Sequence, residues 1–115
     1  MKVPGVAAAA VPKAKITSYL LSRTHPTGRA KAAFFSALGF APENWRALAD
    51  ALIRHAAENE VTTVDETRFG TKYTVEGSLD TPAGPGPVIR VVWFVEKGQT
   101  SPRLVTAYPR QRVEK

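Results

Sequence analysis

A chain of 115 residues is long enough for one domain with a modest core and too short for two. Its hydrophobic content of 43% is ordinary for a globular protein, and no apolar run approaches the roughly 20 residues of a membrane-spanning helix. The absence of cysteine excludes disulfides, thiol catalysis and cysteine-based zinc sites. The formal net charge of +6 favours a polyanionic partner, although many small basic domains bind no nucleic acid.

The chain divides into three parts by composition. Residues 1–12 contain prolines, a glycine and four consecutive alanines, which predicts a flexible leader. The apolar stretch within them, Val6–Val11, is short and Ala-rich and makes a poor signal peptide. We expect a single domain over residues 13–109 and a basic C-terminal tail over residues 110–115.

Helical patterns are confined to the first half of the domain. The spacing predicts one or two helical turns around Ile16–Leu21, followed by a turn-rich connection in which Pro26 biases His25 towards extended backbone. A second helix is expected from about Gly28 to Leu38, with Thr27 as its N-cap and Gly39 at its end. Its expected buried stripe is Ala30, Phe34, Ala37 and Leu38, with Phe35 at the margin.

The strongest helical pattern begins at Pro42, a favourable first-turn residue, and continues to about Glu58. His55, near its end, is interpreted as a surface residue or a partner of the helix dipole. The apolar stripe of this helix follows the i, i+3, i+4 spacing at Trp45, Leu48, Ala49, Leu52, Ile53 and Ala56.

After Asn59 the hydrophobic period changes to two, which is typical of strands. Helices followed by strands with hairpin-length connections indicate an α+β fold, with two or three N-terminal helices packed on one face of a three- to four-stranded, mostly antiparallel sheet. The loop before the third strand is expected at Pro82–Pro87. The strands are expected at Val61–Val64, Thr71–Leu79, Val88–Glu96 and Arg103–Tyr108.

The two faces of the expected sheet differ in character. Alternation along Val88–Glu96 places Trp93 on an apolar face, where we expect it to share one core with Trp45. Burial of the polar groups on the other face would cost several kcal/mol, so that face is either exposed to solvent or a site. Arg90 on this face either pairs with Glu76 or binds an anion. The polar groups of this face are Lys72, Thr74, Arg90, Thr106 and Tyr108.

Motifs for common chemistries are missing. The sequence has no P-loop, no GxGxxG and no nucleophile elbow, and its two histidines lie 30 residues apart, without metal-ligand spacing. We therefore expect no metal and no cofactor, which leaves acid–base chemistry with cationic stabilisation. His25 lies near Arg23, Arg29 and Lys31, so it either acts beside a bound phosphate or is a loop histidine without a role.

Four stretches carry a resemblance to a known family: TSYLLSRTHPTGRAKAAFFSALGF, FGTKYTVEGSL, VVWFVEKG and PRLVTAYP. Together they resemble a family of small uncharacterised bacterial domains that recur alone and as C-terminal tips of polymorphic toxins. More remotely, helices followed by an antiparallel sheet are similar to the barnase/EndoU/colicin/RelE group of metal-independent ribonucleases. The chain departs from that group in having no glutamate clearly placed as general base.

The resemblance implies a toxin-like endoribonuclease that cleaves RNA by 2′-hydroxyl transesterification without metal. Its partners would be RNA and a cognate acidic antitoxin or immunity protein, with no membrane, and its place of action the cytoplasm of its own or a target cell. A non-catalytic basic module that binds nucleic acid or an acidic protein is the alternative, and a surface that mediates assembly is a third. By analogy of role, the general base is His25, the phosphate ligands are Lys31, Lys72 and Arg90 with Arg29 nearby, and Thr106 or Tyr108 orients the phosphate or protonates the leaving oxygen.

Overall fold

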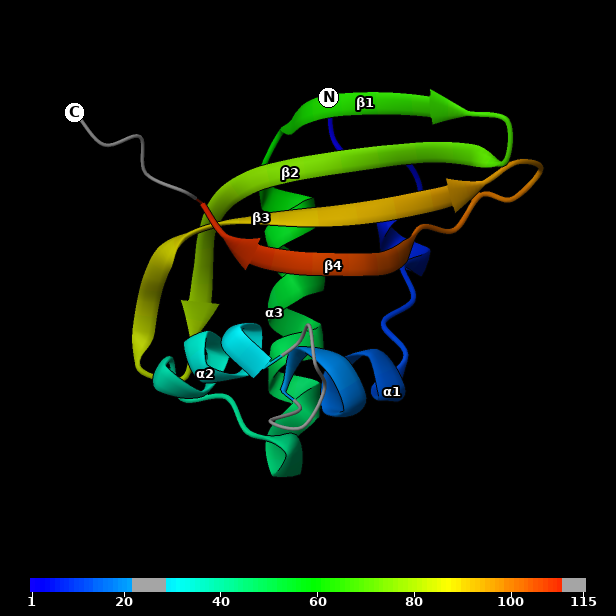
Figure 1. Cartoon of the computed structure of the whole chain (residues 1–115). Helices are drawn as coiled ribbons and strands as arrows, with labels where there is room; N and C mark the ends of the chain where they lie inside the picture. The colour runs from blue at the N-terminus through cyan, green and yellow to red at the C-terminus, as the bar shows by residue number, and fades with distance from the viewer. Residues whose placement is uncertain (22–28, 111–115) are drawn as a thin grey trace.

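The structure is a computed structural model that describes residues 1–21 and 29–110, with the backbone alone for residues 18, 19, 29 and 30. Helical elements come first along the chain and strands follow (Figure 1). The helical elements are η1 (Val6–Ala8), α1 (Lys13–Lys15), the π-helical η2 (Ile16–Leu20), α2 (Arg29–Ala37), η3 (Pro42–Asn44) and α3 (Trp45–Glu58). The strands are β1 (Val61–Thr67), β2 (Gly70–Thr81), β3 (Gly84–Glu96) and β4 (Arg103–Pro109).

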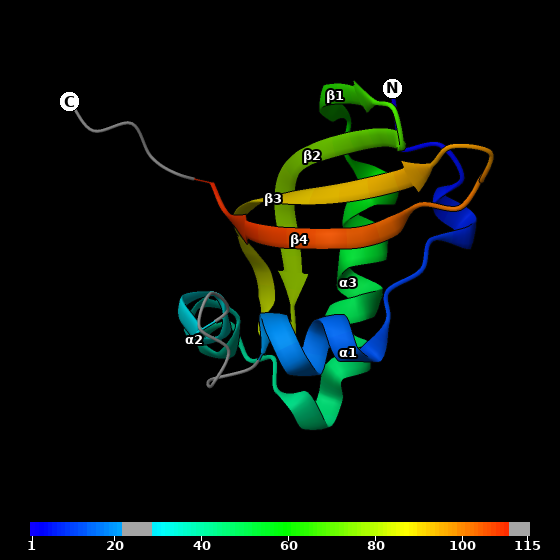
Figure 2. The ribbon, with the colours of Figure 1, turned by 45° about the vertical axis from the view of Figure 1, so that its right-hand side comes forward.

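The four strands form one antiparallel sheet in the order β1-β2-β3-β4. Helix α3 lies behind the sheet, and α1 and α2 lie below β4 in both views (Figures 1 and 2). The far end of the β2–β3 hairpin bends towards α2, and the register shifts between Ser78 and Asp80. At this end Pro82 packs close to Gly39, the left-handed residue that follows α2. The α+β prediction is confirmed.

Helix α3 follows the predicted apolar stripe. Leu48, Leu52 and Ala56 are fully buried, and Trp45 and Ile53 are partly buried against the same core. This core also contains Trp93, which is 0% exposed on β3. The prediction that the two tryptophans share one core is therefore confirmed. Among the described residues, no helix has the length and apolarity needed to cross a membrane.

Helix α2 buries the predicted stripe only in part. Of the predicted stripe, Phe34 and Leu38 pack partly buried against the core and Ala37 is exposed, whereas Phe35, expected at the margin, is 0% exposed with Ala32 buried beside it. Phe35 makes edge-to-face contacts with Phe34 and Phe40, with ring centroids 5.0 and 6.5 Å apart. Because an aromatic ring buries far more apolar area than alanine, the position of Phe35 decides which side of this short helix faces the core.

The N-terminal segment over residues 1–12, for which the sequence predicts a flexible leader, makes several contacts with the rest of the domain. Val3 is 2% exposed, and the Val61 amide donates to the Met1 carbonyl at 2.7 Å. Ala10 pairs with the start of β4, since its amide donates to the Pro102 carbonyl at 2.9 Å. Single valines between prolines and alanines show no period, so the sequence pattern did not reveal that they pack.

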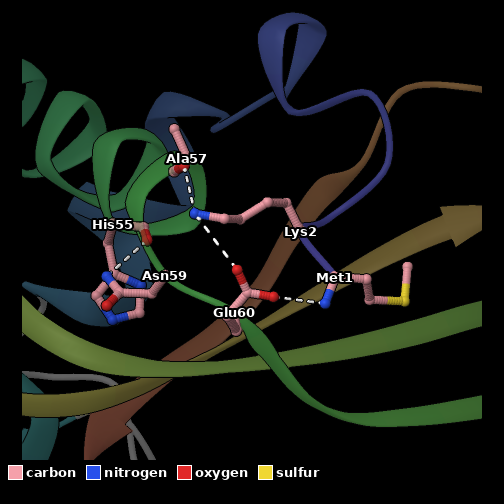
Figure 3. Close-up of polar contacts among 6 residues, drawn as sticks. All are labelled: Met1, Lys2, His55, Ala57, Asn59 and Glu60. Carbon is pink, nitrogen blue, oxygen red and sulfur yellow. Dashed lines mark hydrogen bonds and ion pairs between the residues drawn. The ribbon is translucent and has the colours of Figure 1, made fainter.

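Ion pairs and backbone contacts hold the start of this segment near the end of α3 (Figure 3). The Lys2 Nζ lies 3.3 Å from the Ala57 carbonyl and 3.7 Å from a Glu60 carboxylate oxygen. The other Glu60 oxygen accepts from the Met1 ammonium at 2.5 Å. The segment is therefore attached to both the helix and the first strand.

Strands β1 and β3 extend beyond their predicted limits. β1 continues to Thr67, and β3 begins at Gly84, so most of the expected Pro/Gly loop is strand. The pairing with β4 begins only at Ile89, which leaves Pro85 and Pro87 on an unpaired edge of β3, where proline is tolerated. The Ser78 and Thr81 hydroxyls donate to carbonyls of Gly86 and Gly84, at 2.8 and 2.7 Å.

His55 is buried and not on the surface as predicted. Its side chain is 2% exposed, and its Nε2 lies 3.0 Å from the Gly77 carbonyl of β2. Burial lowers the pKa of this imidazole from its ordinary value, and the Gly77 hydrogen bond opposes that shift. A Cβ atom at Gly77 would overlap the amide of Asn59, which donates to the His55 carbonyl at 2.9 Å (Figure 3). A glycine here lets the end of α3 approach the sheet.

Candidate functional site

The sheet face opposite α3 is called the open face here, and its residues lie in rows set by the strand register. The side chains of one row point the same way because directly paired residues of antiparallel strands share a face. The rows from β2 across β3 to β4 are Glu76, Arg90 and Tyr108; Thr74, Val92 and Thr106; and Lys72, Phe94 and Arg103.

The first row and the residue that follows β4 form a group that we call the Glu76 cluster: Glu76, Arg90, Tyr108 and Arg110. The Glu76 Oε2 accepts from Arg90 Nε and from Arg110 Nε, each at 3.1 Å. Arg110 follows β4, and its amide donates to the Val88 carbonyl at 3.2 Å, which fixes the backbone beside β3. The hydrogen bond to Glu76 raises the pKa of Arg90, and Tyr108 acts in the same direction.

The Glu76 cluster remains accessible to a ligand. The exposed fractions of its charged side chains are 23% for Glu76, 42% for Arg90 and 57% for Arg110. Each guanidinium has five N–H donors in a planar fork that matches phosphate, so a bond to Glu76 leaves donors for an anion. The carboxylate is a proton acceptor, and the Tyr108 phenol can both donate and accept. A phosphodiester bound here would meet cations, a base and an acid together.

The third row places the Phe94 ring at one end of the open face, which we call its aromatic end. The guanidinium carbon of Arg103 lies 5.6 Å from the centre of the Phe94 ring, and Arg103 Nη1 lies 3.9 Å from a Glu96 oxygen. Lys72, directly across from Phe94 on β2, is exposed. Cations and a partly exposed ring on one sheet face are the groups that bind single-stranded nucleic acid.

The structure brings together part of the predicted site. Lys72, Arg90, Thr106 and Tyr108 all lie on the open face, as the alternation predicted. Arg90 also makes the predicted pair with Glu76.

The remaining predicted site residues come from the helical part of the chain. Lys31 lies on α2, away from the rows of the open face, and Arg29 is the first residue of α2, described by its backbone alone. His25 lies outside the described residues, so its place relative to the Glu76 cluster stays a prediction.

Sequence reasoning missed two roles on the open face. The sequence predicts Glu76 only as an ion partner of Arg90, although its row also contains Tyr108. It predicts Arg110 as part of the tail, yet Arg110 continues the i, i+2 spacing of Thr106 and Tyr108. That spacing was the available signal, because Pro109 ends the strand without turning the next residue away from the sheet.

Fold and site define a small α+β domain whose antiparallel sheet is covered on one face by a helix and bears a cationic cluster on the other. The family described as "Domain of unknown function (DUF6883)" matches residues 2–111, and the chain belongs to this family. The match includes the N-terminal segment that packs against the sheet. No curated protein matches the chain, and no solved structure matches it.

Proposed function

We propose that the protein is a toxin-like, metal-independent endoribonuclease whose active site is the open face of the sheet. The observation that carries the proposal is the Glu76 cluster, in which one carboxylate lies 3.1 Å from two guanidinium groups beside a tyrosine. The group is solvent-accessible, and the chain has a net charge of +6, which favours a polyanionic substrate. The order of helices before an antiparallel sheet supports the remote likeness to the barnase/EndoU/colicin/RelE ribonucleases.

In the proposed reaction the nucleophile belongs to the RNA. The Glu76 carboxylate takes the proton from a 2′-hydroxyl, the 2′-oxygen forms a bond to phosphorus, and the bond from phosphorus to the 5′-oxygen breaks. The leaving 5′-oxygen takes a proton from Tyr108, which gives a 2′,3′-cyclic phosphate and a 5′-hydroxyl. Arg90 and Arg110 turn part of their hydrogen bonding from Glu76 to the phosphate and stabilise its developing charge.

This scheme moves the general base from His25 to Glu76, since the open face supplies the glutamate that the sequence did not identify as a base. His25, the general base predicted from the sequence, remains the rival to Glu76 for this role, and Lys31 and Arg29 remain predicted phosphate ligands from the helical part. Lys72 would hold a neighbouring phosphate, and Thr106 would orient the one that is cleaved. An acidic antitoxin or immunity protein would inhibit the enzyme by covering the same cations, in the cytoplasm of the producing or the target cell.

One observation favours the alternative, a basic module that binds RNA or an acidic protein without cleaving it. Both bonds to Glu76 Oε2 come from cations, and such an ion cluster can serve to fix the strands. In that case the open face would bind through Lys72, Arg103 and the Phe94 ring alone. The two functions differ in whether Glu76 has a chemical role.

The test is cleavage of a mixed-sequence RNA in the presence of a chelator, with identification of the product ends. Wild-type protein should give 2′,3′-cyclic phosphate ends, and Glu76→Gln, which keeps the shape but cannot take a proton, should cleave about 10²- to 10⁴-fold more slowly. Glu66→Gln is the matched control, because Glu66 is an exposed carboxylate on β1 whose partner is Thr71 and not a residue of the open-face rows. His25→Ala tests the general base that the sequence predicts.

Melting temperatures of all variants separate chemistry from folding. Loss of cleavage in Glu76→Gln at an unchanged melting temperature, with Glu66→Gln active, supports the ribonuclease. Equal rates in wild type and Glu76→Gln remove Glu76 as the base. RNA binding by a wild-type protein that cleaves none of the substrate supports the binding module instead.

A further inference from the structure

A small pocket lies beside Phe94, at the aromatic end of the open face. Its volume is about 210 Å³. We propose that this pocket binds one unstacked nucleobase of an RNA strand that lies across the open face. This inference rests on the proposed function for its ligand, RNA. It does not depend on RNA cleavage, because a base can bind without any reaction. The pocket is lined by Ala10, Phe94, Glu96, Gln99, Ser101 and Arg103.

The size and the stacking surface of the pocket fit a base. Pockets for drug-sized ligands measure roughly 300–1,000 Å³, so about 210 Å³ suits one planar ring system and not a whole nucleotide. Unstacked RNA bases stack on aromatic rings and on guanidinium planes. Phe94 and Arg103 both line the pocket, and the Arg103 guanidinium carbon lies over the Phe94 ring, 5.6 Å from its centre, so a base would stack on one of these groups and not between them.

The polar groups of the pocket can read the edge of the base. Gln99 supplies an amide with donors and an acceptor, and Ser101 supplies a hydroxyl. Within residues 1–21 and 29–110, neither side chain has a hydrogen-bond partner. A glutamine amide matches the adjacent donor and acceptor of adenine, so adenine is the expected preference.

The walls of the pocket are fixed before RNA binds. The Gln99 amide donates to the Glu96 carbonyl at 2.8 Å, which closes the turn after β3. Ala10 donates to the Pro102 carbonyl at 2.9 Å and accepts from the Leu104 amide at 3.1 Å. The N-terminal segment thereby holds the β3–β4 connection against the sheet, and a wall that is already ordered lowers the entropy cost of binding.

The position of the pocket relative to the Glu76 cluster gives it a role in choosing the cleavage position. Phe94 and Arg90 share a face of β3 and are four residues apart, which is about 13 Å along a strand. A base in the pocket therefore belongs to a nucleotide near the cleaved phosphate and not to the cleaved bond itself. Lys72, across from Phe94, is placed to bind a phosphate on this path.

The test uses the full chain and fluorescently labelled 2′-O-methyl oligoadenylate, which cannot be cleaved through the 2′-oxygen, with an abasic strand of equal length as the comparison. Phe94→Leu keeps an apolar side chain but removes the stacking ring, so it should weaken oligoadenylate binding by roughly 5- to 150-fold and leave the abasic strand unaffected. Gln99→Ala should weaken oligoadenylate binding by about 2- to 12-fold and reduce the preference over oligouridylate. Thr100→Ala, an exposed neighbour outside the pocket lining, is the matched control.

The outcomes separate this proposal from the proposed function. Weaker binding of base-bearing strands alone, in either pocket variant with an unchanged melting temperature, supports the pocket even if the wild-type protein cleaves no RNA. Equal losses for base-bearing and abasic strands, no loss in Gln99→Ala and Phe94→Leu, or no RNA binding by wild type would overturn it. A protein that cleaves RNA but binds as tightly after both substitutions keeps the ribonuclease and loses the pocket.

Discussion

The two faces of the sheet use the same strands for different purposes. On β3, Ile89, Val91 and Trp93 are 0% exposed against α3 and the N-terminal segment. Their neighbours Arg90 and Phe94 are half-buried on the open face, beside ion pairs and a pocket. Because side chains alternate along a strand, adjacent residues can be assigned to stability or to binding, and substitutions can test each face separately.

The largest expected effect is on the covered face. Trp93→Ala should lower the free energy of unfolding by about 3–5 kcal/mol, because it leaves a cavity where a large ring is fully buried. Its neighbour on the open face, Val92→Thr, keeps the shape and should change that free energy by less than about 1 kcal/mol. Urea denaturation measures both, and comparable losses in the two variants would contradict the division of the faces.

The next largest effect is the salt dependence of RNA binding, which tests whether the open face binds through its positive charges. Four cations lie there, namely Lys72, Arg90, Arg103 and Arg110, and Glu76 partly neutralises two of them. Binding of single-stranded RNA should therefore weaken by about 15- to 60-fold between 50 and 200 mM salt, from a log–log slope of about −2 to −3.

The matched variants for this effect differ only in where the charge is lost. Lys72→Ala should reduce the magnitude of the salt slope by about 0.7, as expected for one lost phosphate contact on a single strand. Lys2→Ala removes the same charge at the end of α3, where Lys2 contacts Ala57 and Glu60, and should leave the slope unchanged. Equal slopes in wild type and Lys72→Ala would place the RNA elsewhere.

The smallest effect concerns the titration of His55, on the helix that covers the sheet. Burial lowers the pKa of His55 below its ordinary value of 6.5, so the unfolded chain binds a proton at a higher pH than the folded chain does. The contribution of neutral His55 to stability is therefore fully present above pH 6.5 and is lost as pH falls towards the lowered pKa. Denaturation at pH 7.5 and 5.5 should show a smaller pH dependence in His55→Gln than in wild type. An identical dependence would show that His55 does not titrate on unfolding.

The sequence predicted the packing of those helices and strands in which the apolar residues keep one regular spacing along the whole element. The stripe of α3 and the apolar face of β3 were both found, because long amphipathic patterns leave one solution for packing. The buried stripe of α2 was predicted only in part: Phe34 and Leu38 pack against the core, but Phe35 is the most buried, in contact with Phe40 beyond the end of the helix. The packing of residues 1–12 and the burial of His55 depend on partners distant in sequence, such as Pro102 and Gly77.

The candidate site was predicted in its parts but not as a group. Alternation placed Lys72, Arg90, Thr106 and Tyr108 on one face, and the structure has them there. The pair of Arg90 with Glu76 was one of two predicted alternatives, but the row that adds Tyr108 to this pair depends on the register of three strands, which a single sequence does not determine. The pocket beside Phe94 depends in addition on Ala10, from a segment with no strand pattern of its own.

The bridge between Ala10 and the start of β4 has a consequence for the order of events during synthesis. The hairpins β1–β2, β2–β3 and β3–β4 join neighbours in sequence, so they can form as the chain emerges. The segment around Ala10 is made about 90 residues before its backbone partners at Pro102 and Leu104. The ribosome adds about 5–20 residues per second, so the segment waits several seconds or more for its partners. Tyr108 and Arg110 follow within a few residues, so the bridge at Ala10 and the open-face cluster become possible at nearly the same time.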